Sequence, residues 1–363
     1  MKYLLALTFL AVAVSPAVAT VAEFGQCGGQ EYTGDTVCIT GTVCTVLNPF
    51  FFQCLLPSST GTVAPTTTTT VGTPTGSTTS TAPGATTCAN RTKFKFFGVN
   101  QSGAEFGNNV IPGTWGKDFT FPAPRCFFVG KGFNFFRVPF QLERMVSPTT
   151  GLAGPLSSAY LANYTSTFWT NLAGQFKSNS RVIFDVMNEP NGIAATTVFS
   201  LNQAAVNGIR ASGATTQMIL VEAFTGAWTW VSSGNGAAFA GGIKDPNNNV
   251  AIQMHQYLDS DGSGTNPTCV SSTIGAERLA NATAWLQQNN MKGFLGEIGA
   301  GSNSACISAV FGAFCQMQQS GVWIGASWWA AGPWWPATYF TSIEPPNGLS
   351  IPQILPQALM PFL

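Results

Sequence analysis

A segment of thirty residues without a single charge, residues 58–87, constrains the chain more than any other feature. Fourteen of these residues are Thr, four are Ser and three are Pro. A segment of this composition cannot bury a core and stays extended, as an O-glycosylated stalk does. The segment therefore predicts a folded unit on each side of it, residues 20–57 before the stalk and residues 88–363 after it.

The first 19 residues have the composition of an export signal. Lys2 gives the positive start, residues 4–14 the apolar stretch, and Ala17-Val18-Ala19 the small-residue cleavage site. The apolar stretch is shorter than the roughly 20 residues that span a bilayer. We therefore expect a secreted, extracellular protein with no membrane partner, in which the nine cysteines mostly pair.

The charge balance excludes some partners. Acids and bases number 15 each, so the formal net charge is zero, which argues against nucleic acid. Aromatic residues make up 12% of the chain, more than a core needs, and stacking on ring-shaped substrates is one use for the surplus. Four sequons that could carry glycans in a eukaryotic host begin at Asn90, Asn100, Asn163 and Asn281.

Residues 20–57 are too few for an ordinary core and need cross-links. Four cysteines can supply two disulfides in any of three pairings: Cys27, Cys38, Cys44 and Cys54. Five rings lie among them: Phe24, Tyr32, Phe50, Phe51 and Phe52. A unit this small cannot bury five rings, so we favour a face that stacks on sugars, with the amides of Asn48 and Gln53 bonding the hydroxyls.

This unit resembles a fungal family 1 carbohydrate-binding module, of the cellulose-binding type, from Phe24 to Leu55. The residues that carry the resemblance are Gly25-Gln26-Cys27-Gly28-Gly29, Cys38, Cys44, Asn48-Pro49 and Gln53-Cys54. The resemblance implies the disulfides Cys27–Cys44 and Cys38–Cys54, and it implies cellulose-facing rings at Phe24, Phe50 and Phe51. The family usually has Trp or Tyr at these ring positions, so Phe predicts weaker cellulose binding.

Residues 88–363 alternate short apolar strands with helical stretches. Strands are predicted at residues 94–99, 133–138, 182–186, 218–221, 251–254, 293–295 and 322–326, and helices at 160–177, 198–210 and 275–288. This rhythm predicts an α/β fold, a (β/α)8 TIM barrel. Only seven strands can be found, because the interval between the second and the third holds one helix and no further strand-like run.

Two of the predicted strands end in glutamate. One runs from Val182 to Asn188-Glu189-Pro190, and the other from Gly293 to Glu297. Active sites of such barrels lie where strands end, and glycoside hydrolysis needs two carboxyls beside one bond, one protonated and one ionised. With so few bases available as partners, we favour a catalytic pair over helix caps or salt bridges.

Other strand ends carry supporting side chains. Arg137 could hold down the pKa of the ionised carboxylate, or form a buried structural ion pair. His255, the only histidine, and Tyr257 follow another strand; a lone His is more often structural unless its neighbours give it a role. Core packing could explain one of four rings that lie close together near the last strand, but four so close suggest a sugar-lined cleft: Trp328, Trp329, Trp334 and Trp335.

From about Lys93 to Leu363 the chain resembles glycoside hydrolase family 5, in particular the fungal endo-β-1,4-glucanases. The motifs occur in the family's order: Gly98-Val99-Asn100, Phe136-Arg137-Val138-Pro139, Asn188-Glu189-Pro190, His255-Gln256-Tyr257, Leu295-Gly296-Glu297 and Trp328-Trp329. The resemblance implies double displacement with retention, no metal and no cofactor. It also implies cellulose and soluble β-1,4-glucans as partners, and we expect a monomer.

The resemblance also implies a role for each site residue. Glu189 would be the acid/base and Glu297 the nucleophile. The supporting residues would be Asn188 on the 2-hydroxyl of the reacting sugar, Arg137 and Tyr257 on the nucleophile, His255 against the acid/base, and Trp329 stacking the sugar on the non-reducing side.

The chain departs from the family where the family's third strand ends in a His-Asn pair. No such pair lies between Phe140 and Val182, and about one βα unit, roughly 30 residues, is missing around that strand. Losing a central strand leaves two unpaired edges. Either the barrel closes with seven strands, or an irregular segment fills the place, or the domain is damaged. A mis-predicted gene model would give the same sequence.

Three hypotheses follow. The first is a secreted, retaining endo-β-1,4-glucanase, which the presence of both Glu189 and Glu297 favours. The second is a cellulose-binding protein with an impaired catalytic domain, which the missing His-Asn favours. The third is an endo-acting mannanase or xyloglucanase, because specificity lies in loops.

Residues 88–363 have two further features. The family usually has a Trp in a slightly longer loop where this chain has Glu222-Ala223-Phe224-Thr225. Five cysteines follow the stalk, an odd number that leaves at least one thiol free, and the expected bond among them is Cys269–Cys306.

Overall fold

The computed structural model describes residues 20–21, 26–28, 33–48, 51–55, 88, 91–107, 125–141 and 158–363. Contacts divide the chain into two units, Met1–Ser77 and Thr78–Leu363, and the division falls inside the predicted stalk. Among the described residues, no helix is long and apolar enough to cross a membrane.

The first unit is a three-stranded antiparallel sheet with the order β1-β3-β2, formed by β1 (Gln26–Gly28), β2 (Val43–Asn48) and β3 (Phe51–Leu55). Disulfides join Cys27 to Cys44 and Cys38 to Cys54, the two pairings that the resemblance implies. Cys27 and Cys54 are buried, so the disulfides themselves supply the core of this small unit.

The predicted cellulose-facing residues fall mostly beyond this description. Phe24, Tyr32 and Phe50 lie outside the described residues, and Phe51, Asn48 and Gln53 are described only as members of strands. Phe52 differs from the expectation of a binding ring. A Cβ atom at Gly28 would lie 2.6 Å from the Phe52 ring, so this ring packs against β1 and helps to form the core.

Among its described residues, the second unit contains a sheet of seven parallel strands. They are β4 (Phe96–Gln101), β5 (Phe135–Arg137), β6 (Ile183–Asp185), β7 (Met218–Gly226), β8 (Val250–Tyr257), β9 (Gly293–Gly299) and β10 (Trp323–Ala331). Their order in the sheet is β5-β4-β10-β9-β8-β7-β6. Each of the seven predicted strands is confirmed, and the barrel-like parallel architecture confirms the predicted fold class.

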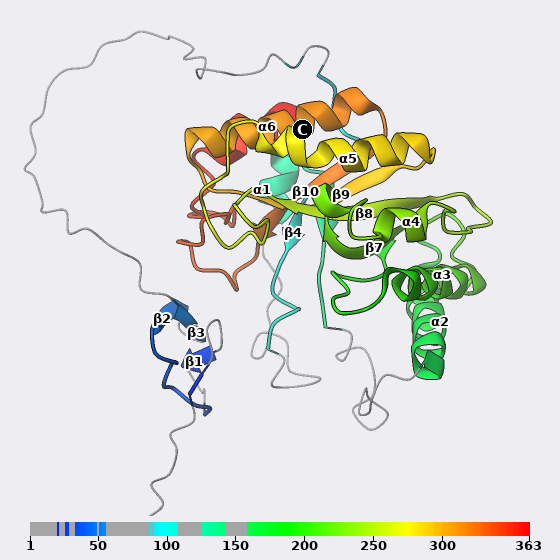
Figure 1. Cartoon of the computed structure of the whole chain (residues 1–363), viewed down its shortest axis with the longest axis horizontal. Helices are drawn as coiled ribbons and strands as arrows, with labels where there is room; N and C mark the ends of the chain where they lie inside the picture. The colour runs from blue at the N-terminus through cyan, green and yellow to red at the C-terminus, as the bar shows by residue number, and fades with distance from the viewer. Residues whose placement is uncertain are drawn as a thin grey trace, which may run out of the picture. The chain divides into compact units, whose positions relative to one another are not determined.

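Helices cover the outside of this sheet. They are α1 (Arg125–Gly130), α2 (Ser158–Phe176), α3 (Ala195–Ala211), α4 (Asn235–Phe239), α5 (Ile274–Gln288) and α6 (Ser304–Ser320), with short helical turns at Ala227–Thr229, Leu355–Leu359 and Met360–Phe362. Figure 1 shows α2 beside α3 and α5 beside α6. The three helices predicted from sequence correspond to α2, α3 and α5.

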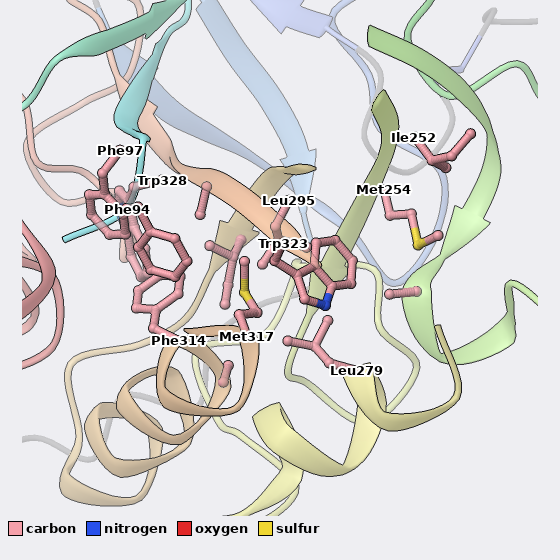
Figure 2. Close-up of a cluster of buried hydrophobic side chains, with 14 of the residues drawn as sticks. Phe94, Phe97, Ile252, Met254, Leu279, Leu295, Phe314, Met317, Trp323 and Trp328 are labelled. Atoms are coloured by element: carbon pink, nitrogen blue, oxygen red, sulfur yellow. The ribbon is translucent and has the colours of Figure 1, made fainter. Parts of the chain in front are cut away.

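Apolar side chains fill both faces of the sheet. Outside it, Figure 2 shows Phe94, Phe97, Phe314, Met317 and Trp323 packed between strands and helices. Inside it, every one of the seven strands contributes to a single cluster: Phe96, Phe135, Ile183, Met218, Leu220, Ala251, Phe294 and Ile324. The seven strands therefore curve around one shared interior core, as barrel strands do.

The sheet has two ends, β5 and β6, and we call the interval between them the seam. Within the described part of the chain, neither strand pairs with another strand on its outer side. Residues 142–157, which connect β5 to α2, lie outside the described residues. The two ends are nevertheless close, because Arg137 Nε on β5 donates to Asp185 Oδ2 on β6 at 2.6 Å. Side chains thus bridge the place where the missing strand would pair.

The remaining cysteines and one sequon test smaller expectations. The expected Cys269–Cys306 bond is present, a second bond joins Cys88 to Cys315, and Cys126 is free and exposed. The sequon at Asn100 is wrong as a glycan site. Asn100 is fully buried and its amide donates to the Gly296 carbonyl at 2.9 Å, so no glycan fits there in the folded chain.

Candidate active site

The C-terminal ends of the parallel strands bring the predicted residues together. Arg137 ends β5, Asn188 and Glu189 follow β6, His255 and Tyr257 lie in β8, and Glu297 lies in β9. Because parallel strands place their carboxyl ends at one edge of the sheet, six side chains from four strands meet there. Hydrogen bonds join Arg137, Asn188, Tyr257 and Glu297 into one group and His255 to Glu189 in another. The two groups meet where His255 Nδ1 lies 3.6 Å from Glu297 Oε2.

Both carboxylate oxygens of Glu297 are held by donors. Arg137 Nη1 donates to Oε1 at 2.7 Å, and the Tyr257 hydroxyl donates to Oε2 at 2.5 Å. Burial, together with the charge of Glu297, raises the pKa of Tyr257 well above its ordinary value, so the phenol keeps its proton and remains a donor. Glu297 is therefore a buried carboxylate in a fixed orientation.

Arg137 is the centre of the cluster. Besides Asp185 and Glu297, its guanidinium donates to the side-chain oxygens of Asn100 at 2.9 Å and of Asn188 at 2.7 Å. Burial alone would lower the pKa of Arg137, but the charges of the neighbouring acids outweigh burial and raise it above the ordinary value. Arg137 is thus a permanent buried cation, which explains why acids gather around it.

Glu189 differs from Glu297 in both exposure and backbone. Its side chain is 41% exposed, whereas that of Glu297 is 6% exposed. Its φ of 41° is in the left-handed region, which an L residue with a long side chain rarely adopts and which costs roughly 1–3 kcal/mol. This conformation turns the chain sharply after β6, and a carboxylate oxygen of Glu189 lies within 4.8 Å of one of Glu297.

His255 stands between the acids. Its Nδ1 is 2.6 Å from Glu189 Oε1 and 3.6 Å from Glu297 Oε2, and its Nε2 is 3.4 Å from Glu222 Oε1. Burial lowers the pKa of His255, but Glu222, Glu297 and the hydrogen bond with Glu189 outweigh it and raise that pKa to about 9. The lone histidine therefore has neighbours that keep it charged, which is the condition for a functional role.

The charge on His255 acts in turn on Glu189. Burial raises the pKa of Glu189, but the hydrogen bond from His255 and its charge lower it further than burial raises it. The pKa of Glu189 is therefore below its usual value in the chain without substrate. The proton of this pair is on His255 Nδ1, 2.6 Å from Glu189 Oε1, a distance over which it can transfer directly.

Three residues of the cluster were missed by the sequence reasoning. Asp185 pairs with Arg137, Glu222 lies beside His255, and Gln253 Nε2 donates to both of these acids, at 3.1 Å to Asp185 and 2.7 Å to Glu222. A signal for them exists in the sequence. Asp185 and Glu222 are acids inside apolar strands, where a buried charge requires partners.

Core packing accounts for one of the four neighbouring tryptophans. Trp328 is fully buried, its indole N–H donates to the Thr341 carbonyl at 2.7 Å, and Figure 2 shows it in the core near Phe97. Trp329, Trp334 and Trp335 are each half-buried. The ring centroids of Trp329 and Trp335 are 6.3 Å apart, and Phe106 stacks on Trp334 with ring centroids 4.9 Å apart. Three indoles, not four, are available at this end of β10.

One group of side chains could offer ligands to a metal ion. Apart from disulfide-bonded cysteines, the described residues bring together Glu189, His255 and Glu297, with one ligand atom of each within 4.8 Å of the others. Both oxygens of Glu297 are already hydrogen-bonded, one of them by the guanidinium of Arg137. A permanent cation in that position opposes a second one, so we assign no metal to these three residues.

Two family descriptions match the chain. Residues 153–332 match cellulase (glycosyl hydrolase family 5), and residues 23–51 match the fungal cellulose binding domain. These two matches fall on opposite sides of the predicted stalk.

Curated relatives and a solved structure agree with these matches. Endoglucanase gh5-1 of Neurospora crassa is 45% identical, and the match covers 95% of each chain. Endoglucanase 3 of Humicola insolens is 42% identical and covers 92% of this chain and 93% of its own. The endo-beta-1,4-glucanase Xac0029 of Xanthomonas axonopodis pv. citri superposes with a TM-score of 0.66 at 34% identity, over 75% of this chain and all of that one.

Proposed function

Because the chain belongs to glycosyl hydrolase family 5, we propose that it is a secreted, retaining endo-β-1,4-glucanase that binds cellulose through its N-terminal unit. One observation carries the chemical part of this proposal. Two carboxyls at strand ends, those of Glu189 and Glu297, have oxygens within 4.8 Å of each other. Glu189 is exposed, whereas Glu297 is buried. Retaining glycosidases separate their carboxyls by about 5–5.5 Å, whereas inverting ones leave about 6.5–9.5 Å for a water molecule.

The proposed reaction has two displacements. In the first, Glu297 attacks the anomeric carbon and the glycosidic bond breaks, while the leaving oxygen takes the proton of the Glu189–His255 pair. In the second, Glu189 takes a proton from water, the resulting hydroxide attacks the same carbon, and Glu297 is released. Two inversions at one carbon retain its configuration.

The neighbours of Glu297 support the role of nucleophile. Arg137 and Tyr257 bond its two oxygens in the free protein, so attack requires no search for an orientation. Arg137 also fixes the side chain of Asn188 by donating to Oδ1, which leaves the amide Nδ2 as the atom offered to a substrate hydroxyl. This supports the proposed contact of Asn188 with the 2-hydroxyl of the reacting sugar.

The rest of the chain suits attack on an insoluble polymer. We propose that residues 1–19 are a signal peptide, 20–57 a cellulose-binding module, 58–87 a linker and 88–363 the catalytic domain. In the module, Phe24, Phe50 and Phe51 would stack on cellulose beside Asn48 and Gln53, and in the catalytic domain Trp329 would stack the sugar on the non-reducing side. Anchoring raises the concentration of a monomeric extracellular enzyme at its substrate.

The seam favours a second candidate function, a cellulose-binding protein with an impaired catalytic domain. In the described part of the chain, β5 and β6 pair with no strand on their outer sides, where the resemblance implies a further strand. The sequence also has no second histidine for the family's His-Asn pair. A chain damaged at this point would still bind cellulose and would not hydrolyse it.

A reducing-end assay on soluble carboxymethyl-cellulose separates the two candidates. The proposed function predicts release of new reducing ends by the chain as written and none by the Glu297→Gln variant. The same assay is carried out on mannan and on xyloglucan. Activity on one of these and none on carboxymethyl-cellulose would identify the chain as a mannanase or a xyloglucanase. A folded, cellulose-binding protein that releases nothing from any of the three would be a binding protein.

A further inference from the structure

Glu222 is a third acid at the site, and the reaction proposed above does not use it. It lies in β7 and is fully buried. A carboxyl with no access to solvent needs hydrogen-bond donors or a neighbouring positive charge to compensate for lost hydration. The contacts of its two oxygens therefore indicate what it is for.

Its oxygens face two different partners. Oε1 accepts the backbone N–H of Glu189 at 3.2 Å and lies 3.4 Å from His255 Nε2. Oε2 accepts from Gln253 Nε2 at 2.7 Å and lies 4.0 Å from Arg137 Nη2. Oε1 thus contacts Glu189 and His255, whereas the hydrogen bond to Oε2 fixes the rotation of the Glu222 carboxyl.

The surroundings hold Glu222 in this position. The side chain of Asn202 on α3 bonds the Glu222 backbone twice, accepting its N–H at 3.1 Å and donating to its C=O at 2.9 Å. Gly296 leaves room for Gln253, since a Cβ atom at position 296 would lie 2.5 Å from the Gln253 side chain. Both supports come from buried residues, so the orientation of Glu222 is built into the fold.

Its contact with Glu189 falls on a strained backbone. Glu189 has a φ of 41°, and conformations of this kind persist only where the surroundings impose them. A carboxylate accepting the N–H of that residue forms a hydrogen bond of the charge-assisted type, about twice as strong as a neutral one. Glu222 therefore helps to impose the turn that aims Glu189 at the site.

Its contact with His255 completes the charge around the imidazole. The buried Nε2 atom has no hydrogen bond within the described residues, and Glu222 Oε1 is the acid that faces it. On the other side, Nδ1 faces Glu189 and Glu297, while Arg137 opposes a charge on the ring and the Tyr257 phenol remains neutral. Asp185 is a further acid of the cluster, joined to Glu222 through Gln253.

We propose that Glu222 is a positioning residue for the acid/base: it fixes the backbone of Glu189 and keeps His255 charged, so that the Glu189–His255 pair retains the proton that the leaving group needs. The catalytic consequence rests on the proposed function, whereas the statement about His255 does not. Burial raises the pKa of Glu222 to about 7 although His255 and Arg137 lower it. Between this value and the value of about 9 for His255, the two form an ion pair.

The single histidine makes a direct test practical, because the imidazole resonances of the full chain belong to His255 alone. The chain is prepared without a histidine tag, labelled with ¹³C-histidine, and titrated by NMR as wild type, Glu222→Gln and Glu277→Gln. Glu277 is an exposed acid on α5 and serves as the matched control. We expect a wild-type midpoint at least a unit above the ordinary 6.5, and a drop of about one to three units in Glu222→Gln, as removal of a facing charge produces.

An equal midpoint in wild type and Glu222→Gln would overturn the proposal, and so would a wild-type midpoint at or below 6.5. Near-UV circular dichroism establishes that each variant is folded. If Glu222→Gln does not fold, the wild-type midpoint and Glu222→Asp decide, because Asp keeps the charge and so keeps the midpoint raised. A drop of a unit or more in Glu222→Asp would also contradict the proposal.

Kinetics give a readout that a merely structural role would not move. Because the leaving group needs the proton of the Glu189–His255 pair, Glu222→Gln is expected to shift the alkaline limb of kcat/KM on carboxymethyl-cellulose to lower pH. Glu222→Asp should lower kcat without moving that limb. An equal loss at every pH in Glu222→Gln would contradict the proposal. A wild-type chain without activity would refute the proposed function instead. The NMR titration would still test whether Glu222 raises the pKa of His255.

Discussion

The two sides of the active site are held together in different ways. On one side, β8 pairs with β9 so that His255 stands opposite Glu297 and Tyr257 opposite Gly299. There the backbone ladder sets the distance between Glu297 and His255, which contacts Glu189. On the other side is the seam, where β5 and β6 form no ladder with each other in the described structure, and Arg137 and Asp185 meet through their side chains.

This difference indicates which side chains contribute to both the stability of the fold and the activity of the site. A paired strand keeps its register when one side chain is changed, because the main-chain hydrogen bonds remain. Where charged side chains bridge two strands, as at the seam, a substitution removes the interaction that holds the strands together. We therefore expect loss of the central cation at the seam to cost more stability than loss of one side-chain donor on the paired side, while both lower activity.

The largest effect is expected from Arg137→Met. The change removes the cation from between buried acids, among them Glu297 and Glu222, and leaves their charges uncompensated. Removing one partner of a buried ion pair costs about 3–5 kcal/mol of stability, and here it should also abolish hydrolysis. Urea unfolding followed by fluorescence measures the first effect, and reducing-end release the second. Wild-type stability in this variant would mean that the seam is held by something else.

Tyr257→Phe is the counterpart on the paired side. It deletes one donor to Glu297 and leaves the ring and the β8–β9 ladder intact. We expect kcat to fall about 100-fold, as loss of one preorganised donor does, and stability to fall by about 2 kcal/mol, the scale of one hydrogen bond to a charged group. A loss of stability as large as that of Arg137→Met would remove the distinction between the two sides.

Asp185→Asn and Asp245→Asn sharpen the comparison with a matched pair. Each removes one carboxylate that accepts from a buried arginine, Asp185 from Arg137 at the seam and Asp245 from Arg210 away from the site. Both should lose about 2 kcal/mol, the scale of a hydrogen bond to a charged group. Asp185→Asn alone should also lose activity, because Arg137 then positions Glu297 less well. Full activity in this variant would show that the seam and the nucleophile are independent.

The smallest effect, for a change of one pH unit, is the dependence of stability on pH. The pKa of His255, about 9 in the folded chain against an ordinary 6.5, contributes stability below 6.5 that is lost as pH rises through 9. Glu222, raised from 4.5 to about 7, acts in the same direction between those two values. The urea midpoint should therefore fall between pH 6 and pH 9, and less steeply in His255→Gln. A midpoint that rises over this range would contradict the charge arrangement around His255.

Much of the fold was predictable from the sequence because the second unit repeats one local pattern. Each apolar run became a strand of the sheet, from β4 near Phe96 to β10 near Trp323, and the gap after the second run became the seam. The ends of strands located Glu189 and Glu297 because barrel geometry puts such ends together.

What could not be predicted depends on which side chains meet. Asp185 and Glu222 are ordinary members of strands in the sequence, and only the curvature of the sheet brings them to Arg137. Trp328 and Trp329 are neighbours in the chain, yet alternation along β10 buries one and leaves the other half-exposed. Asn100 matches a glycan sequon but points into the barrel. Each of these outcomes is set by tertiary packing.

The central claim is that the seven strands of the described residues, with the seam between β5 and β6, still assemble a working retaining site. The most direct measurement is covalent trapping with 2,4-dinitrophenyl 2-deoxy-2-fluoro-β-cellobioside, followed by mass spectrometry of the intact chain and of its peptides. The account predicts one fluorocellobiosyl group, mapped to Glu297, and none in Glu297→Gln. A folded chain that remains unlabelled, or that is labelled at another residue, would contradict it.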